Sequence, residues 1–157
     1  MMAATGALLV GSGLSACGED AGAASMPDDR IEILELAVEN DQFGAPDLAP
    51  AGASVGDVSA YTGWLTKDGR RVGQGGGSCQ NVRVDGAEIT KQCVITVRLE
   101  QGSLTMQALG QLDESPLDMA ITGGTSDYRG AQGIVRYWDI AKPTERLRAE
   151  ITHPTRD

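Results

Sequence analysis

The chain has 157 residues, a net charge of −9, 21 glycines and few aromatic residues (one Phe, three Tyr, two Trp). This length suffices for one domain with its own hydrophobic core. The negative charge excludes nucleic acid as an expected partner, because phosphates would be repelled. No apolar run of about 18 residues follows the N-terminus, so no transmembrane helix is expected.

The first residues form a separate segment. Residues 1–17 carry no charged side chain, and Leu14-Ser15-Ala16-Cys17 resembles a bacterial lipobox, whose Cys becomes lipid-modified. We favour the lipoprotein interpretation, although the Lys or Arg of a signal peptide is missing; a disordered leader is the alternative. We exclude residues 1–28 from the fold and expect one domain over 29–157. Lipidation of Cys17 would make the protein secreted or membrane-anchored, touching the membrane only through the lipid; without processing it would be cytoplasmic.

The remaining sequence predicts strands rather than helices, because apolar residues alternate with polar ones. Phe43 to Ser54 (FGAPDLAPAGAS) reads as a long loop between the first two strands. The predicted strands cover residues 31–39, 55–67, 70–84, 89–99, 104–112, 117–121, 132–140 and 146–152.

Three central strands define an apolar face that we expect to point inward. Lys91 interrupts it near one end, where its ammonium can reach solvent. The inward set is Cys93, Ile95, Val97, Leu99, Leu104, Met106, Ala108, Gly110, Leu112, Leu117, Met119 and Ile121. Small members such as Ala108 and Gly110 leave room for a ligand, although an eight-stranded barrel is also just wide enough for its side chains to fill.

Short turns join the strands, including Lys67-Asp-Gly, Val84-Asp-Gly and Glu100-Gln-Gly. Consecutive hairpins with one apolar face indicate an antiparallel meander. Eight strands can close on themselves and so remove the exposed edges. We therefore predict an all-β fold, an eight-stranded antiparallel up-and-down β-barrel.

Two cysteines test this register. Cys79 and Cys93 lie seven residues either side of Gly86, the centre of a predicted turn. In an ungapped hairpin they would lie opposite each other, with Cα atoms about 4.5 Å apart in a non-hydrogen-bonded pair. We favour a disulfide, as expected in an oxidising compartment; two buried free thiols are the alternative.

The glycine-rich stretch Ile121–Gly133 (ITGGTSDYRGAQG) has three interpretations. A phosphate loop would end in Gly-Lys-Ser/Thr and lead into a helix, whereas a strand-like segment follows here. A flexible linker would lack the apolar anchors Ile121 and Tyr128. A tight turn between two barrel strands remains, with glycine supplying positive φ and close approach.

At this point the sequence resembles a known family. "ITGGTSDYRGAQGIV" is similar to the C-terminal signature of the allene oxide cyclase and dirigent β-barrels, and Val55–Cys79 resembles that family's Gly-Asp strand and hairpin. Together these motifs cover residues 31–140 in the same order. Ser126-Asp127 departs from the family, which often has a glycine there.

The resemblance implies one of three activities. Plant allene oxide cyclases close a ring on an epoxide, dirigent proteins orient radicals or quinone methides, and bacterial polyketide (spirotetronate-type) cyclases catalyse intramolecular [4+2] cyclisations. All use the barrel interior without a metal or nucleotide, so no cofactor is expected. Homodimers or homotrimers are also implied. The glutamate-bearing strand of the plant enzymes matches Glu35–Glu39 poorly, so the plant activity is not carried over.

The residues agree with positioning chemistry better than with hydrolysis. The inward set has no His, Asp or Glu, and His153 reads as a solvated residue of a polar tail. Tyr137 is expected to point inward because the other parity would bury Arg136. Tyr61 matches an inward aromatic of the bacterial cyclases. These two tyrosines are our candidate catalytic groups, although both could simply pack in the core.

We therefore expect a cofactor-independent cyclase that folds a flexible, hydrophobic, polyketide-like substrate inside the barrel. A non-enzymatic dirigent-like or lipocalin-like surface lipoprotein that binds such a ligand is the alternative. No metal site is predicted. The expected substrate-binding residues are Cys93, Ile95, Met106, Ala108, Gly110, Leu112, Met119, Ile121, Trp64 and Trp138.

Overall fold

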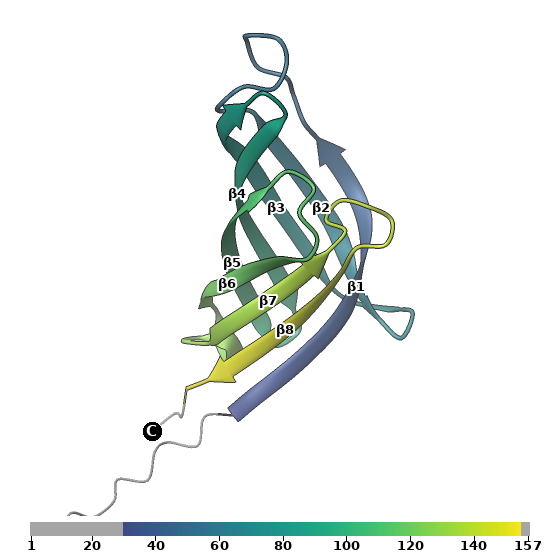
Figure 1. Ribbon diagram of the computed structural model, residues 1–157. Coiled ribbons are helices and arrows are strands. Elements are labelled where there is room, and N and C mark those ends of the chain that lie inside the picture. The colour runs from purple at the N-terminus through teal and green to yellow at the C-terminus, as the bar shows by residue number, and fades with distance from the viewer. Residues whose placement is uncertain (1–29, 155–157) are drawn as a thin grey trace, which may run out of the picture.

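A computed structural model describes residues 30–154 of the chain. Eight strands form a single closed barrel in which every strand pairs with its neighbours in sequence and β1 pairs with β8 (Figure 1). The strands are β1 (Arg30–Gly44), β2 (Val58–Lys67), β3 (Arg70–Asp85), β4 (Glu88–Leu99), β5 (Gly102–Gln111), β6 (Leu117–Gly124), β7 (Gln132–Trp138) and β8 (Arg146–His153). The predicted all-β, up-and-down antiparallel barrel is confirmed.

Alternation along the strands builds the core. On β4 the side chains of Cys93, Ile95 and Val97 are buried, and the residues between them are exposed. The same period of two holds on β8, because successive strand side chains point to opposite faces. The interior is therefore a column of apolar side chains, as the sequence pattern predicted.

Different connections lie at the two ends of the barrel. Long loops 45–57, 112–116 and 139–145 all arise at one end, which we call the mouth. The opposite end, the base, has the short β2–β3 and β4–β5 turns and the point where β1 begins and β8 ends (Figure 1). Binding space is consequently expected at the mouth, because loops rather than strands surround it there.

The glycine-rich stretch is a connection at the base. It joins β6 to β7 through a 3₁₀ turn, η1 (Ser126–Tyr128), whose Tyr128 is buried. Gly133 has φ 134°, and a Cβ there would collide with the backbone of Glu150 on β8. Only glycine allows the two strands to approach this closely. The interpretation as a barrel turn is confirmed, with one 3₁₀ turn where a tighter connection was expected.

Among residues 30–154, no helix is long and apolar enough to span a membrane. The lipobox-like segment and Cys17 lie outside the described residues.

Candidate functional site

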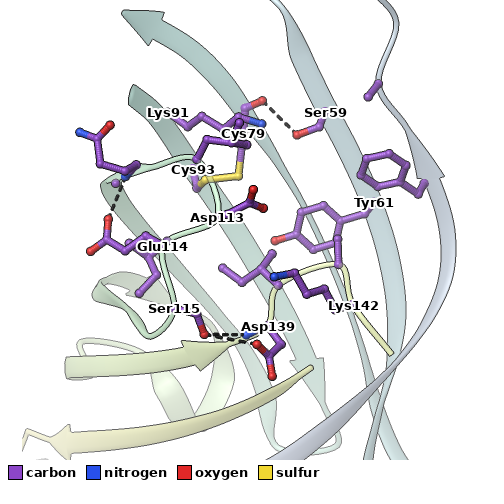
Figure 2. A pocket seen from close by; sticks show the side chains of 18 residues that line it. Ser59, Tyr61, Cys79, Lys91, Cys93, Asp113, Glu114, Ser115, Asp139 and Lys142 are labelled. Atoms are coloured by element: carbon purple, nitrogen blue, oxygen red, sulfur yellow. Dashed lines mark hydrogen bonds between the residues drawn. A yellow bond between two sulfur atoms is a disulfide. The ribbon is translucent and has the colours of Figure 1, made fainter. Parts of the chain in front are cut away.

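A cavity of ≈220 Å³ opens at the mouth of the barrel (Figure 2). Its walls come from the inner faces of β2 to β5 and from the loops 112–116 and 139–145. Phe43, Leu112, Leu117 and Ile140 give it an apolar wall, and several charged side chains line it as well. A mostly apolar recess with a few converging polar groups is the usual form of a small-molecule site.

Tyr61 projects from β2 into this cavity (Figure 2). The residue is 7% exposed, and its hydroxyl is a buried polar atom without a hydrogen-bond partner. Burial raises the pKa of Tyr61, and the nearby Glu145 carboxylate raises it further. The phenol is therefore neutral at ordinary pH and available to donate a hydrogen bond. Leaving such a group unsatisfied costs about 1–3 kcal/mol, which a ligand acceptor would recover.

Tyr137 and Glu145 lie close to Tyr61. Burial raises the pKa of Tyr137 well above its ordinary value, and Tyr61 and Glu145 add to this effect. Burial also raises the pKa of the Glu145 carboxyl, while hydrogen bonds from the Ala141 N–H and from Asn40 lower it in part. The barrel thus holds a carboxyl that releases its proton less readily than a solvated one, beside two phenols that keep theirs.

Glu145 also holds the 139–145 loop against β1. Its Oε2 accepts hydrogen bonds from the Ala141 N–H at 2.7 Å and from Asn40 Nδ2 at 3.2 Å. Asn40 Nδ2 also donates to the Lys142 carbonyl at 2.9 Å. Since Ile140, Ala141 and Lys142 line the cavity, these bonds fix one of its walls.

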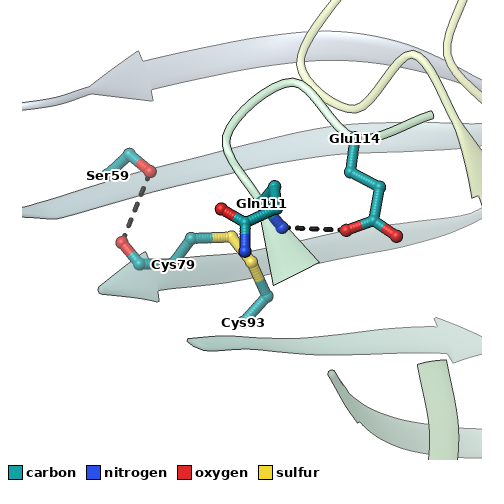
Figure 3. The surroundings of a disulfide bond; sticks show 5 residues. All are labelled: Ser59, Cys79, Cys93, Gln111 and Glu114. Atoms are coloured by element: carbon teal, nitrogen blue, oxygen red, sulfur yellow. Dashed lines mark hydrogen bonds between the residues drawn. A yellow bond between two sulfur atoms is a disulfide. The ribbon is translucent and has the colours of Figure 1, made fainter. Parts of the chain in front are cut away.

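A disulfide forms another part of the wall. Cys79 on β3 and Cys93 on β4 are bonded, with Cα atoms 4.0 Å apart and a register that places them opposite each other. Ser59 Oγ on β2 donates to the Cys79 carbonyl at 3.4 Å (Figure 3). Across the mouth, the Gln111 N–H donates to Glu114 Oε2 at 2.8 Å. The predicted disulfide is present, but the hairpin is not ungapped as expected. Asp85 pairs with Glu88 across the turn, and a register shift between Asn81 and Arg83 brings Cys79 opposite Cys93.

The predicted interior residues divide into two groups. The members that line the cavity are Cys93, Gly110, Leu112, Leu117 and Tyr61, although the Leu112 side chain is 42% exposed at the rim rather than buried. The others do not line it: Ile95, Met106, Met119 and Ile121 are buried in the core, and Ala108 packs against them. Side chains fill the barrel below the cavity, so the ligand space is confined to the mouth.

Tyr137 points inward, as parity predicted, and is 2% exposed within the core. It is not among the cavity-lining residues. Its neighbour Arg136 faces outward and forms an ion pair with Asp118 at 2.6 Å. The cost of burying the Arg136 guanidinium therefore assigned the inward face of β7 correctly.

The two tryptophans are placed differently from our expectation. Trp64 alternates with the buried Tyr61 and Leu65 and lies under the guanidinium of Arg71, 4.6 Å from the ring centroid. Trp138 is covered by Arg146 in the same way, at 4.8 Å. The prediction that both rings line the interior is wrong, because both stack with cations on the outer surface.

Sequence reasoning missed two polar residues of the interior. Glu145 is 3% exposed and His153, expected to be solvated, is 7% exposed. His153 Nε2 lies 2.7 Å from Glu32 Oε2, and its ring contacts Tyr128 at the base. A signal was available: both continue the parity of the buried β8 residues, whose full row is Glu145, Leu147, Ala149, Ile151 and His153.

Within residues 30–154, no three His, Cys, Asp or Glu side chains are grouped so that they could hold a metal ion. The polar groups available at the cavity are phenol, carboxyl and ammonium groups. These can bind, orient and exchange protons with a ligand.

Comparison with known proteins identifies the family to which this barrel belongs. Residues 33–152 match the family described as "allene oxide cyclase barrel like domain". The structure of a pyocyanin demethylase is 31% identical, covers 77% of this chain and 100% of its own, and superposes with a TM-score of 0.73. No curated protein sequence is similar enough to count as a match.

More distant structures share the barrel. The Diels–Alderase AbmU from Streptomyces koyangensis is 14% identical, with 81% of this chain and 70% of its own covered and a TM-score of 0.65. The pterocarpan synthase dirigent protein GePTS1 is 19% identical, with 83% and 94% covered and a TM-score of 0.61. At these identities the likeness shows the shared fold alone.

Proposed function

We propose, for a chain that belongs to the allene oxide cyclase barrel-like family, that the cavity at the mouth is an active site for a compact, planar aromatic heterocycle. The observation that carries this proposal is the buried Tyr61 hydroxyl, which has no partner among the described residues. A hydroxyl in this position favours a ligand that brings a hydrogen-bond acceptor to the floor of the cavity.

The size of the cavity supports a compact ligand. Sites for drug-sized ligands span roughly 300–1,000 Å³, whereas this one has ≈220 Å³. A small, rigid ring system can fill it, while a long flexible polyketide chain would have to extend into the adjoining cavity of ≈260 Å³ or beyond it. The likeness to pyocyanin demethylase, at 31% identity over that whole chain, favours a heteroaromatic ring system and N-demethylation as its reaction. In a balanced form of this step water supplies an oxygen, the methyl carbon leaves as formaldehyde, and the ring system takes up the two electrons as its dihydro form.

The chain's own residues would contribute binding, orientation and proton control. Tyr61 would donate a hydrogen bond to a ring heteroatom or oxygen that gains negative charge during the reaction, which stabilises the transition state. Glu145, whose pKa is raised by burial, would release its proton less readily than a solvated carboxyl. The apolar wall would exclude water around both groups.

The cyclisation expected from the sequence is the second candidate. It is favoured by the apolar wall of Phe43, Leu112, Leu117 and Ile140, which could fold a short polyene so that its ends approach. For this cyclase we also propose that the reaction needs no cofactor. A dirigent-like or lipocalin-like binder would use the same cavity without turnover.

The experiment is titration of the purified protein with pyocyanin, followed by mass analysis of the products. We expect saturable binding and loss of the N-methyl group in the wild type, both reduced in Tyr61→Phe. Ser59→Phe, which fills the cavity, should abolish both; Ala60→Phe, on the outer face of the same strand, should not. Binding of pyocyanin without turnover would favour the non-enzymatic binder. Conversion of a short diene–dienophile substrate in place of pyocyanin would favour the cyclase. No binding at all would contradict the proposed site.

We also propose that the protein is exported and lipidated at Cys17. The Cys79–Cys93 disulfide supports export, because structural disulfides persist in oxidising compartments. Intact mass analysis of protein from its own host should show a diacylglycerol-sized addition. An unmodified N-terminus would contradict this proposal without affecting the proposed active site.

A further inference from the structure

Within residues 30–154, three charged side chains of the cavity wall lack partners: Lys91, Asp113 and Lys142. Lys91 lies on β4 two residues before Cys93, so it shares the inward face, and it is half-buried. It lines both the main cavity and an adjoining cavity of ≈260 Å³ under the 45–57 loop. Among residues 30–154 it forms no ion pair and no hydrogen bond.

Asp113 is the second unpartnered charge. It lies in the 112–116 loop with φ 62°, lines the main cavity and is directed into it (Figure 2). In the described part of the chain its carboxylate has neither an ion pair nor a hydrogen bond, and it does not pair with Lys91.

The neighbouring carboxylates are engaged by the protein itself. Glu114 accepts the Gln111 N–H, and Asp139 accepts hydrogen bonds from Thr144 and Ser115. In the adjoining cavity, Asp57 accepts N–H groups of its own loop, which hold its pKa below the usual value. These carboxylates are held in place by protein donors, which leaves Asp113, the half-buried Lys91 and the exposed Lys142 as the charged groups of the main cavity without a protein partner. Of the two cations, Lys91 lines both cavities and is screened less by water because it is less exposed.

We propose, resting on the proposed function, that Lys91 and Asp113 select a dipolar ligand. An anionic substituent would bind Lys91 at the junction of the two cavities, and the electron-poor or cationic part of the ring system would face Asp113. Tyr61 supplies the third fixed point. Lys91 is half-buried, so water screens its charge less than that of the exposed Asp113. Two separated charges of opposite sign would fix the orientation of the ligand, with Lys91 contributing more to its affinity.

The test measures dissociation constants for three ring-matched probes at neutral pH: phenazine (neutral), phenazine-1-carboxylate (anionic) and 5-methylphenazinium (cationic). Lys91→Gln should weaken binding of the carboxylate about tenfold and leave the cation unchanged or tighter. Asp113→Asn should do the reverse. Lys67→Gln and Asp68→Asn make the same charge changes at the β2–β3 turn at the base. These control variants should change the dissociation constants of all three probes only slightly and to a similar extent.

The two proposals fail in different ways. If none of the three probes binds the wild type, the proposed aromatic site is wrong and this inference falls with it. If the probes bind but Lys91→Gln and Asp113→Asn leave their affinity ratios unchanged, the site stands and charge selection is overturned. Opposite shifts in the two variants, absent in the turn controls, would support the inference.

Discussion

At the scale of single residues, removing the Tyr61 hydroxyl should change stability and ligand affinity in opposite directions. Its buried hydroxyl has no partner, so Tyr61→Phe removes a desolvation cost from the folded state. We expect the free energy of unfolding of the ligand-free protein to rise by about 1 kcal/mol, while ligand affinity falls about five- to tenfold. Urea unfolding and absorbance titration measure the two quantities.

The matched control for this change is Tyr128→Phe, at the base. It should leave ligand affinity unaltered. A Tyr61→Phe protein that unfolds more easily and binds as before would show that the hydroxyl serves the fold instead of a ligand.

Glu145 makes stability depend on pH. Burial raises its folded pKa, so between the unfolded and the folded pKa the native protein binds a proton that the unfolded chain has released. Stability from this group is therefore full below the unfolded pKa and decreases as pH rises through the folded pKa. Glu145→Gln should raise the free energy of unfolding at pH 8 more than at pH 5, measured by urea denaturation. An equal effect at both pH values would contradict the assignment.

At the scale of elements, the disulfide fastens β3 to β4 beside the cavity. It closes a segment of sequence separation 14, for which the loss of unfolded-state entropy contributes about 3 kcal/mol. We expect the Cys79→Ala, Cys93→Ala double variant to lose about 2–3 kcal/mol of unfolding free energy, and reductant to lower the stability of the wild type only. Equal stability with and without reductant would argue that the β3–β4 hairpin is held by its strand pairing alone.

The 139–145 loop depends on one amide. Asn40 Nδ2 bonds both the Lys142 carbonyl and Glu145 Oε2, so Asn40→Ala should loosen this wall of the cavity. Ligand dissociation should accelerate several-fold, and amide hydrogen exchange should increase in residues 139–145. Gln42→Ala is the control, because Gln42 lies on the same strand and its side chain makes no hydrogen bond to that loop in the described part of the chain. Unchanged exchange in the Asn40 variant would contradict the anchoring role.

Strand elements were predictable because their signal is local. Alternation located all eight strands, seven of them to within three residues. The first was predicted too short: β1 continues to Gly44, so Phe43 belongs to the strand and not to the loop to which the sequence assigned it. Side-chain direction failed where the period was ambiguous, as at Trp64, where both faces carried small or apolar residues. The cavity was less predictable, since its walls come from loops whose conformation depends on long-range bonds such as Asn40 to Glu145.

At the scale of the whole molecule, the barrel is closed by the β1–β8 seam. Arg30 to Ala37 pair with His153 to Arg146, and the buried Glu32–His153 contact at 2.7 Å adds a side-chain bond across the seam. His153→Ala leaves the Glu32 carboxylate without this partner, so we expect a loss of about 1–2 kcal/mol in unfolding free energy at neutral pH. Glu150→Ala, which removes an exposed ion pair to Arg148 on the same strand, should cost under about 1 kcal/mol. Equal losses would show that the buried contact does not strengthen the seam.

The β1–β8 seam also determines at which end of the barrel the first described strand begins. β1 begins at Arg30 at the base (Figure 1). The cavity opens at the opposite end, among the loops of the mouth. A lipid attached ahead of Arg30 would therefore tether the barrel by its closed end and present the open end to the surrounding medium. In that arrangement small molecules would reach the cavity from the aqueous phase, without first partitioning into the bilayer.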